Sequence, residues 1–149
     1  MKLHQLSLFI ENQPGHLVAP CRVLAQAGIN ILTLSIAETQ RFGILRFVVR
    51  DWERAKAVLT DAGHVVNVTE VIAVEVPDRP GALADVLDAL SKASVNVEYL
   101  YAFTFKRGNR GALLFRFDQA DSAIVALRAA GISVWNSEEL FNLLESVKD

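Results

Sequence analysis

Apolar and polar residues alternate near the start of the chain in the manner of a partly buried β-strand. Leu6, Leu8 and Ile10 all fall on one side of an extended chain, and a more polar set falls on the other. Residues 71–76, apolar except for Glu75, take the same part later in the chain. The pattern predicts a strand over residues 6–10 and an equivalent strand over residues 71–76.

A helix is predicted after the first strand, because apolar residues then recur at helical spacing. Pro14-Gly15 interrupts the strand, and one side of the predicted helix carries Leu17, Cys21, Leu24 and Gly28. Gly28 is a natural end for this helix, since glycine accepts the left-handed conformation common at helix C-termini. The remaining pattern predicts strands over residues 29–37 and 43–49, a helix over 55–62 and a short strand over 65–68. The element order is therefore βαββαβ.

The same pattern occurs twice. Pro14-Gly15 recurs as Pro80-Gly81, and further matches lie at the same offset: Leu17 with Leu83, Leu24 with Leu90, Ala27 with Ala93, Asn30 with Asn96 and Leu34 with Leu100. From Gly43 onward the offset between the copies is two residues longer. At this longer offset Gly43 matches Gly111, Leu45 matches Leu113, Phe47 matches Phe115, Leu59 matches Leu127 and Gly63 matches Gly131. The two extra residues belong in the polar segment 106–110, where an insertion is tolerated. We therefore predict a tandem duplication.

The duplication predicts an α+β protein built from two ferredoxin-like βαββαβ units, with antiparallel sheets that carry helices on one face. The predicted domains are residues 1–69 and 70–136, followed by a helical tail over 137–149. Asn136 or Ser137 can cap the tail helix, whose apolar face consists of Leu140, Phe141, Leu144 and Val147. We expect this helix to cover an edge or face of the second unit, or to lie against a partner subunit.

Composition narrows the possible functions. The chain of 149 residues has a formal charge of −2 and no basic stripe, which argues against nucleic-acid binding. No apolar stretch approaches the roughly 20 residues that cross a bilayer, and the N-terminus lacks the features of a signal peptide. One cysteine, Cys21, fits a reducing compartment. The expectation is a cytoplasmic protein that contacts neither membrane nor nucleic acid.

No arrangement of residues suggests catalysis. Cys21 lies on the core-facing side of its predicted helix and is expected to be a buried structural thiol. The histidines His4, His16 and His64 show no metal-ligand spacing. There is no nucleophile elbow and no glycine-rich phosphate loop. We therefore expect no catalytic residue, no metal site and no cofactor.

The repeated loops after the first strand of each copy are the best candidates for ligand binding. Proline fixes its φ, glycine allows another group to approach closely, and the N–H groups at a helix start suit a carboxylate. The alternative interpretation is a tight turn capped by Asn12 or Asp78. Asn30 and Asn96 follow the helices, where each either satisfies local backbone or grips a polar ligand.

These loops resemble the opening of an ACT domain. The resemblance rests on residues 78–83 (Asp-Arg-Pro-Gly-Ala-Leu) with Leu90 and residues 95–97 (Val-Asn-Val), and on residues 12–17 with residues 28–31. It covers both copies, and residues 36–46 resemble stand-alone tandem ACT proteins, which carry no catalytic domain. The family implies domains that pair side by side into a continuous eight-stranded sheet. It also implies amino-acid ligands held between the Pro-Gly loop of one domain and strands of its neighbour.

The resemblance assigns ligand-binding roles by position. The matching residues are Asn12, Gln13, Gly15, His16 and Leu17 in the first copy, Asp78, Arg79, Gly81, Ala82 and Leu83 in the second, and Asn30 and Asn96 after the helices. The copies differ, since neutral Asn12 corresponds to Asp78, and Thr33 and Ser35 correspond to Tyr99 and Tyr101. The two sites are therefore expected to be unequal.

The sequence thus favours a non-enzymatic regulatory sensor of a free amino acid. The expected partners are a second copy of the chain and a metabolic enzyme. The alternative is a structural or assembly subunit of such an enzyme with vestigial ligand sites. RNA binding, known for other βαββαβ modules, is disfavoured by the absence of a basic aromatic strand. An acylphosphatase-like enzyme would need a phosphate-cradling loop around an arginine, and Arg79 has only Gln13 as its counterpart.

Overall fold

The computed structural model describes residues 1–107 and 109–146. The elements in chain order are β1 (Leu3–Glu11), α1 (Val18–Gln26), β2 (Ile31–Glu38), β3 (Phe42–Val49), α2 (Trp52–Asp61), β4 (Val66–Pro77), α3 (Ala82–Lys92), β5 (Val97–Arg107), β6 (Arg110–Phe117), α4 (Ala120–Ala129), β7 (Val134–Trp135) and α5 (Ser137–Glu145). Gly108, in the segment expected to hold the two extra residues, and Val147, expected on the tail helix, lie outside the described residues.

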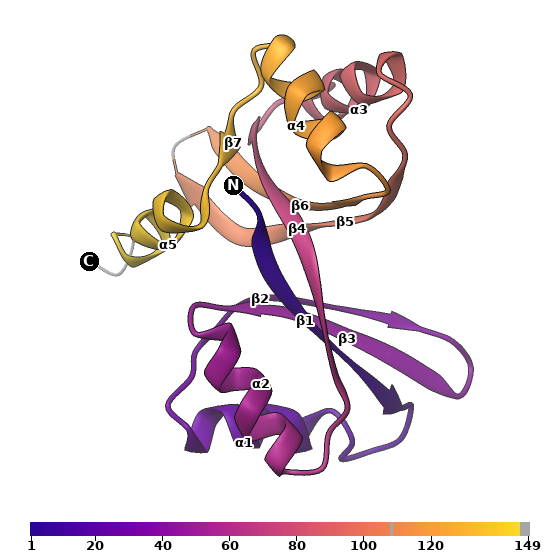
Figure 1. The fold of residues 1–149 in the computed structure, drawn as a ribbon, viewed down its shortest axis with the longest axis vertical. Coiled ribbons are helices and arrows are strands. Elements are labelled where there is room, and N and C mark those ends of the chain that lie inside the picture. Colours follow the sequence, from indigo (N-terminus) through magenta and orange to yellow (C-terminus); the bar gives the residue numbers. More distant parts are fainter. Residues whose placement is uncertain (108, 147–149) are drawn as a thin grey trace. The chain divides into compact units, whose positions relative to one another are not determined.

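The chain divides into two compact units. The N-terminal unit comprises His4–Thr69, and the C-terminal unit comprises Met1–Leu3 together with the residues from Glu70 onward. Strand order is β2-β3-β1-β4 in the first unit and β5-β6-β4-β7 in the second. In each unit a pair of helices, α1 with α2 or α3 with α4, lies over one face of the sheet (Figure 1). The predicted fold class, two α+β ferredoxin-like units with antiparallel sheets, is confirmed.

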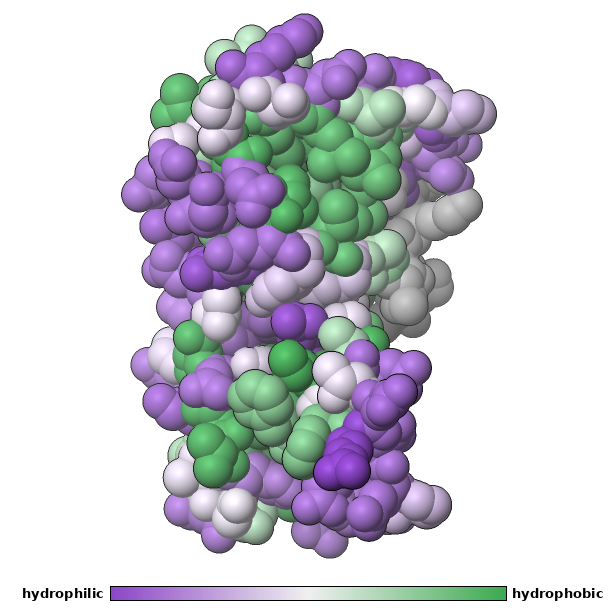
Figure 2. All heavy atoms as spheres, turned by 90° about the vertical axis from the view of Figure 1, so that its right-hand side faces the viewer, coloured by the Kyte–Doolittle hydropathy of each residue, from purple (hydrophilic) through white to green (hydrophobic). Residues whose placement is uncertain are grey.

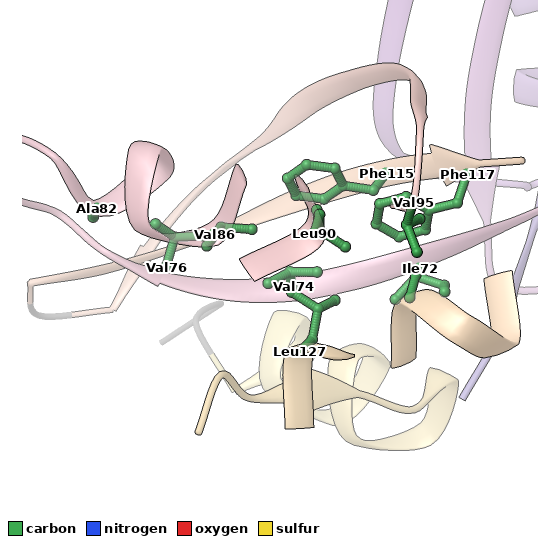
Figure 3. Close-up of a cluster of buried hydrophobic side chains, with 11 residues drawn as sticks. Ile72, Val74, Val76, Ala82, Val86, Leu90, Val95, Phe115, Phe117 and Leu127 are labelled. Carbon is green, nitrogen blue, oxygen red and sulfur yellow. The ribbon is translucent and has the colours of Figure 1, made fainter. Parts of the chain in front are cut away.

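The core of each unit lies between its helices and the apolar face of its sheet. The N-terminal core consists of Leu6, Leu8, Leu24, Leu45, Phe47, Val49, Ala55 and Leu59. In the C-terminal core, side chains from β4, β6 and both helices point toward one another (Figure 3). Positions matched by the duplication are equivalent here, since Phe47 lies opposite Leu6 and Phe115 lies opposite Ile72. The repeat in the sequence is thus a repeat of core positions.

One difference concerns the junction between the copies. Residues 65–68 and 71–76 were expected to be separate strands, but β4 runs without interruption over Val66–Pro77. Its first residues complete the strand order of the first unit, and its later residues pair with β6 and β7. The described residues therefore form seven strands instead of eight. Thr69 and Glu70, which link the two segments, both accept extended backbone, so nothing ends the strand there.

The tail helix is capped by Asn136, one of the two predicted candidates. Asn136 Oδ1 accepts a hydrogen bond from the Glu139 backbone N–H at 2.8 Å, and Glu139 Oε2 accepts one from the Asn136 N–H at 3.0 Å. This reciprocal pair is a capping box, which satisfies two N–H groups at the helix start. Leu140 of α5 is fully buried. The helix therefore packs within its own chain, as the first of the two expectations proposed.

The first residues of the chain are tied to the C-terminal unit by Lys2. Its Nζ lies 3.2 Å from Glu70 Oε2 and 3.2 Å from Asp121 Oδ1. The hydrogen bond to Asp121, and after it that to Glu70, raises the pKa of Lys2 above its ordinary value of 10.5. The folded-state pKa is raised, so the resulting stabilisation is present below pH 10.5 and is lost as the pH rises through the raised value.

We expect Lys2→Gln to lower the melting temperature slightly at pH 8, because exposed ion pairs contribute little. The difference from the original chain should shrink as the pH rises above 10.5. Calorimetric melting between pH 8 and about pH 12 measures it, with Lys92→Gln at an exposed lysine of α3 as the control. A difference that stays constant over this range would show that the ion pairs are not its cause.

Candidate functional site

The two Pro-Gly loops form the same turn. In the first, the Gln13 N–H donates to the Glu11 carbonyl at 2.9 Å and the His16 N–H to the Gln13 carbonyl at 3.3 Å. In the second, Arg79 and Ala82 make the equivalent bonds, to the Pro77 and Arg79 carbonyls, at 3.0 and 3.3 Å. The N–H groups of His16 and Ala82 are thus used within the turn. Any ligand carboxylate would have to rely on the other N–H groups of each loop.

The glycines of these turns are needed for their backbone conformation. Gly15 has φ of 88° and Gly81 has φ of 84°, values at which a side chain is strained. A Cβ at Gly15 would meet nothing within 4 Å. Within the chain itself, the positive φ is therefore what requires glycine at Gly15. Helix α1 begins only at Val18, later than the Pro-Gly break suggested.

Asn12 and Asp78 do not occupy the N-cap positions of their helices. The N-cap residue of α1 is Leu17 and that of α3 is Gly81, and the side chain of neither makes a capping hydrogen bond. Instead the loops are bound to the neighbouring hairpins. The Asn12 N–H donates to the Arg41 carbonyl at 3.0 Å, and the Asp78 N–H donates to the Asn109 carbonyl at 2.6 Å. Each loop is thereby fixed beside the β2–β3 or β5–β6 turn.

In the N-terminal unit this arrangement leaves a hollow of about 330 Å³ between the loop and β2. Its lining residues are Ile10, Glu11, Asn12, Gln13, Leu17, Ile36, Glu38 and Gly43. Three of the predicted site residues, Asn12, Gln13 and Leu17, thus meet in one place. Sequence reasoning missed Glu11 and Glu38, whose carboxylates make this hollow acidic. The alternation of β2 could have indicated Glu38, but only the register shows that the end of β2 returns to the loop.

The remaining loop residues of this unit lie outside that lining. Gly15 sets the turn, and His16 points toward Glu11, with His16 Nδ1 at 3.8 Å from Glu11 Oε2. A protonated His16 would form an ion pair there. His16 therefore borders the hollow through its contact with Glu11.

The C-terminal loop is arranged differently. Arg79 Nη2 donates to Asp85 Oδ2 at 2.5 Å, and Arg79 Nη1 donates to the Pro80 carbonyl at 3.1 Å. Arg79, Ala82 and Asp85 line a hollow of about 360 Å³ that extends toward the end of α4. The repeat places Gln13 and Ala19 at the positions of Arg79 and Asp85, so this ion pair has no equivalent in the first unit. The expectation of unequal loops is consistent with this geometry.

The two asparagines after the helices do not meet the loops of their own units. Asn30 precedes the first residue of β2, whereas the hollow lies at Ile36 and Glu38 near its end. At about 3.3 Å per residue this separates Asn30 from the loop by more than about 20 Å. Asn96 is placed equivalently, and its backbone N–H donates to Asp118 Oδ1 at 3.0 Å. Within one unit, helix α1 or α3 spans the distance between the two predicted halves of the site.

The cysteine expectation is corrected by the structure. Cys21 is only half-buried, and Leu87 at the equivalent position is 36% exposed. This side of α1 and α3 borders an edge of each sheet, where Leu17, Leu34, Ile36 and Leu83 are also exposed. Figure 2 shows one face of the surface, on which hydrophobic residues lie among hydrophilic ones.

The family follows from a match along almost the whole chain. A family model described as an ACT domain pair matches residues 1–144. The chain belongs to the ACT domain pair family. ACT domains are regulatory and non-catalytic. The predicted resemblance is therefore confirmed.

Solved structures agree with this assignment. A protein from Bacteroides thetaiotaomicron is 38% identical, with a TM-score of 0.88 over 95% of this ACT domain pair and 96% of its own chain. The ligand-free regulatory subunit of aspartate kinase from Thermus thermophilus is 19% identical, with a TM-score of 0.63 over 87% of this chain and 93% of its own. The corresponding subunit from Thermus flavus is 20% identical, with a TM-score of 0.64 over 88% and 92%. The two aspartate kinase subunits show a shared fold.

A comparison with curated proteins gave no significant match. Within residues 1–107 and 109–146, no group of three or more His, Cys, Asp or Glu side chains is placed to hold a metal ion. In the same part of the ACT domain pair, no helix has the length and apolar character to cross a bilayer.

Proposed function

We propose that this ACT domain pair is a non-catalytic regulatory protein that binds a free amino acid at the Pro-Gly loop of its N-terminal unit. The observation that supports it is the hollow where Asn12, Gln13 and Leu17 meet β2. In this proposal the ligand carboxylate is held by backbone N–H groups at the start of α1, aided by the helix dipole. The ligand ammonium is held by Glu11 or Glu38, which supply the negative charge it requires.

The position of Asn30 suggests how the site is completed. β2 is an edge strand of its sheet, and Leu34 and Ile36 on it are 48% and 44% exposed. A second copy that lies along β2 in the antiparallel sense would place its Asn30 beside the Pro-Gly loop of the first copy. We therefore propose a homodimer in which each ligand contacts Asn12 and Gln13 of one chain and Asn30 of the other.

A thermal-shift panel of the common amino acids tests this function. A ligand present at about 100 times its dissociation constant adds roughly 2.7 kcal/mol to the free energy of unfolding. Asn12→Ala, Gln13→Ala and Asn30→Ala should each weaken the shift. Gln26→Ala, an exposed glutamine at the far end of α1, is the matched control and should leave the shift unchanged.

If no amino acid raises the melting temperature, the sensor function is wrong. If a shift is seen but Asn30→Ala has no effect, binding takes place without the proposed second copy. Sedimentation of the original chain with and without ligand then gives the oligomeric state directly.

The C-terminal loop favours a second candidate, a structural subunit that assembles with a metabolic enzyme. There, Arg79 donates to Asp85 and to the Pro80 carbonyl, so its guanidinium is occupied within the loop. Co-purification with an enzyme that persists without any amino acid, and in the Asn12→Ala variant, would favour this candidate over the sensor.

A further inference from the structure

A hollow that takes no part in the proposed amino-acid site lies in the C-terminal unit. It is a cleft of about 780 Å³ at the β7 side of the sheet, bounded by the last turn of α4, by β7 and by α5. The residues used below are Glu75, Arg110, Arg128, Ile132, Trp135 and Leu143. Its volume falls in the range of about 300–1,000 Å³ typical of small-molecule sites. We call it the α5 cleft.

Glu75 is held in place within this cleft by two hydrogen bonds. Its side chain is only 13% exposed, and Oε1 accepts a hydrogen bond from Arg110 Nη1 at 2.5 Å. Oε2 accepts a second bond from Trp135 Nε1 at 3.2 Å. Both carboxylate oxygens are therefore engaged, and the indole ring of Trp135 is held in one orientation. The glutamate organises the cleft and has little capacity left to bind a cation.

The side chains that line the cleft offer more unused hydrogen-bond donors than acceptors. Arg128 is exposed in the last turn of α4, and within the described residues it has no ion-pair partner. Arg110 is 68% exposed and has further N–H groups beyond the one donated to Glu75. The other carboxylate of the lining, Glu139, accepts from the Asn136 N–H in the capping box. An entering group meets guanidinium N–H groups that are not all used within the cleft, which favours an anion.

The N-terminal unit shows that the fold does not require these charges. The duplication places Phe9 and Phe42 at the positions of Glu75 and Arg110, and Thr60 and Asn67 at those of Arg128 and Trp135. Phe9 and Phe42 are 69% and 52% exposed. The same βαββαβ unit thus forms without an arginine, a tryptophan or a tail helix at this position. A role in the fold alone does not explain why the arginines, the tryptophan and the tail helix occur together in the C-terminal unit.

We propose that the α5 cleft binds a small organic anion with an apolar body. The carboxylate or phosphate of the ligand would be held by Arg110 and Arg128, and its body would lie against Trp135, Ile132 and Leu143. This site is independent of the Pro-Gly loop site of the N-terminal unit. The ACT domain pair would then carry two ligand sites of different chemistry, one in each unit.

Trp135 supplies a direct readout, since the only other tryptophan is Trp52 in the N-terminal unit. In the Trp52→Phe chain, tryptophan emission reports the α5 cleft alone. The probes are C3 to C6 mono- and dicarboxylates and phosphorylated sugars, each paired with its neutral amide or its unphosphorylated form. We expect a saturable change in emission with at least one anion and none with its neutral partner. Calorimetric titration of the original chain with the same probes gives the result without any substitution.

Variants identify the groups that bind. Arg128→Gln should weaken binding at least about tenfold, as expected for the loss of hydrogen bonds to a charged group. Arg128→Lys should weaken it less and leave stability unchanged, because the charge at the end of α4 is kept. Arg22→Gln, at an exposed arginine of α1, is the matched control. Asn12→Ala should leave the Trp135 response intact, which separates this site from the amino-acid site.

Binding that survives Arg128→Gln unchanged would overturn the proposal. So would the absence of binding by every anion in both fluorescence and calorimetry. A carboxylate series that binds while sugar phosphates do not, or the reverse, identifies which class of anion the cleft takes.

Discussion

Replacing Phe47 or Phe115 with alanine is expected to lower the free energy of unfolding by about 3–5 kcal/mol, the usual range for a large buried aromatic side chain. Both side chains are fully buried, and the duplication makes them equivalent. Each lies opposite an aliphatic residue of the adjacent strand, Leu6 for Phe47 and Ile72 for Phe115. Truncation would leave a cavity in the core of one unit that the β-sheet and two helices cannot close.

The two tryptophans allow the loss to be assigned to a unit. Trp52 reports the N-terminal unit and Trp135 the C-terminal unit, so urea titrations followed by fluorescence in Trp52→Phe and Trp135→Phe backgrounds resolve both. Phe9→Ala is the control, because Phe9 is 69% exposed and its loss should change stability by less than about 0.5 kcal/mol. Equal midpoints for Phe47→Ala and Phe9→Ala would contradict the assignment of Phe47 to the core.

The core could be predicted from the sequence because its apolar residues recur at the spacing of a strand or a helix, and because this pattern occurs in both copies. Leu6 and Leu8 alternate on a strand, Leu24 falls on one face of a helix, and both patterns recur at a fixed offset. A period of two or 3.6 residues is a local property, so it can be read without knowing the neighbours. The duplication then removes most chance matches, since a false pattern seldom occurs twice in register.

The ligand site at the Pro-Gly loop was less predictable, because it depends on which ends of the helices and strands lie close together. Asn30 and the Pro-Gly loop are joined by one helix, and the length of that helix together with the direction of β2 places them at opposite ends of the unit. Glu38 approaches the loop through the register of the β2–β3 hairpin. These relations depend on pairing between distant segments, for which a single sequence carries no periodic signal. Cys21 was misjudged for a related reason, since a helix at a sheet edge leaves part of its apolar face uncovered.

Comparison of the copies shows where the duplication has diverged. The core positions keep their character, whereas Glu75 and Arg110 correspond to Phe9 and Phe42. Core positions are constrained by packing in both units, so changes accumulate where the surface is free to acquire a different chemistry. The two units are therefore alike in what folds them and unlike in what they can bind.

Leu140→Ala is expected to destabilise the C-terminal unit by about 2–5 kcal/mol. Leu140 is fully buried on a helix of nine residues, a length at which a helix has little stability without its packing. The capping box of Asn136 and Glu139 secures only the start of α5. Once the leucine contact is lost, the remaining turns should fray, and the amide protons of α5 should exchange faster than those of α4.

The same substitution tests the wall of the α5 cleft, because Glu139 and Leu143 belong to this helix. If the proposed anion site exists, Leu140→Ala should weaken anion binding even under conditions where the rest of the C-terminal unit stays folded. Asn142→Ala, at an exposed position of α5, is the matched control for both stability and binding. Hydrogen exchange of α5 combined with Trp135 fluorescence separates the outcomes. Unchanged exchange in Leu140→Ala would show that Leu140 does not anchor the helix. Faster exchange with unchanged anion affinity would show that α5 is not part of the binding site.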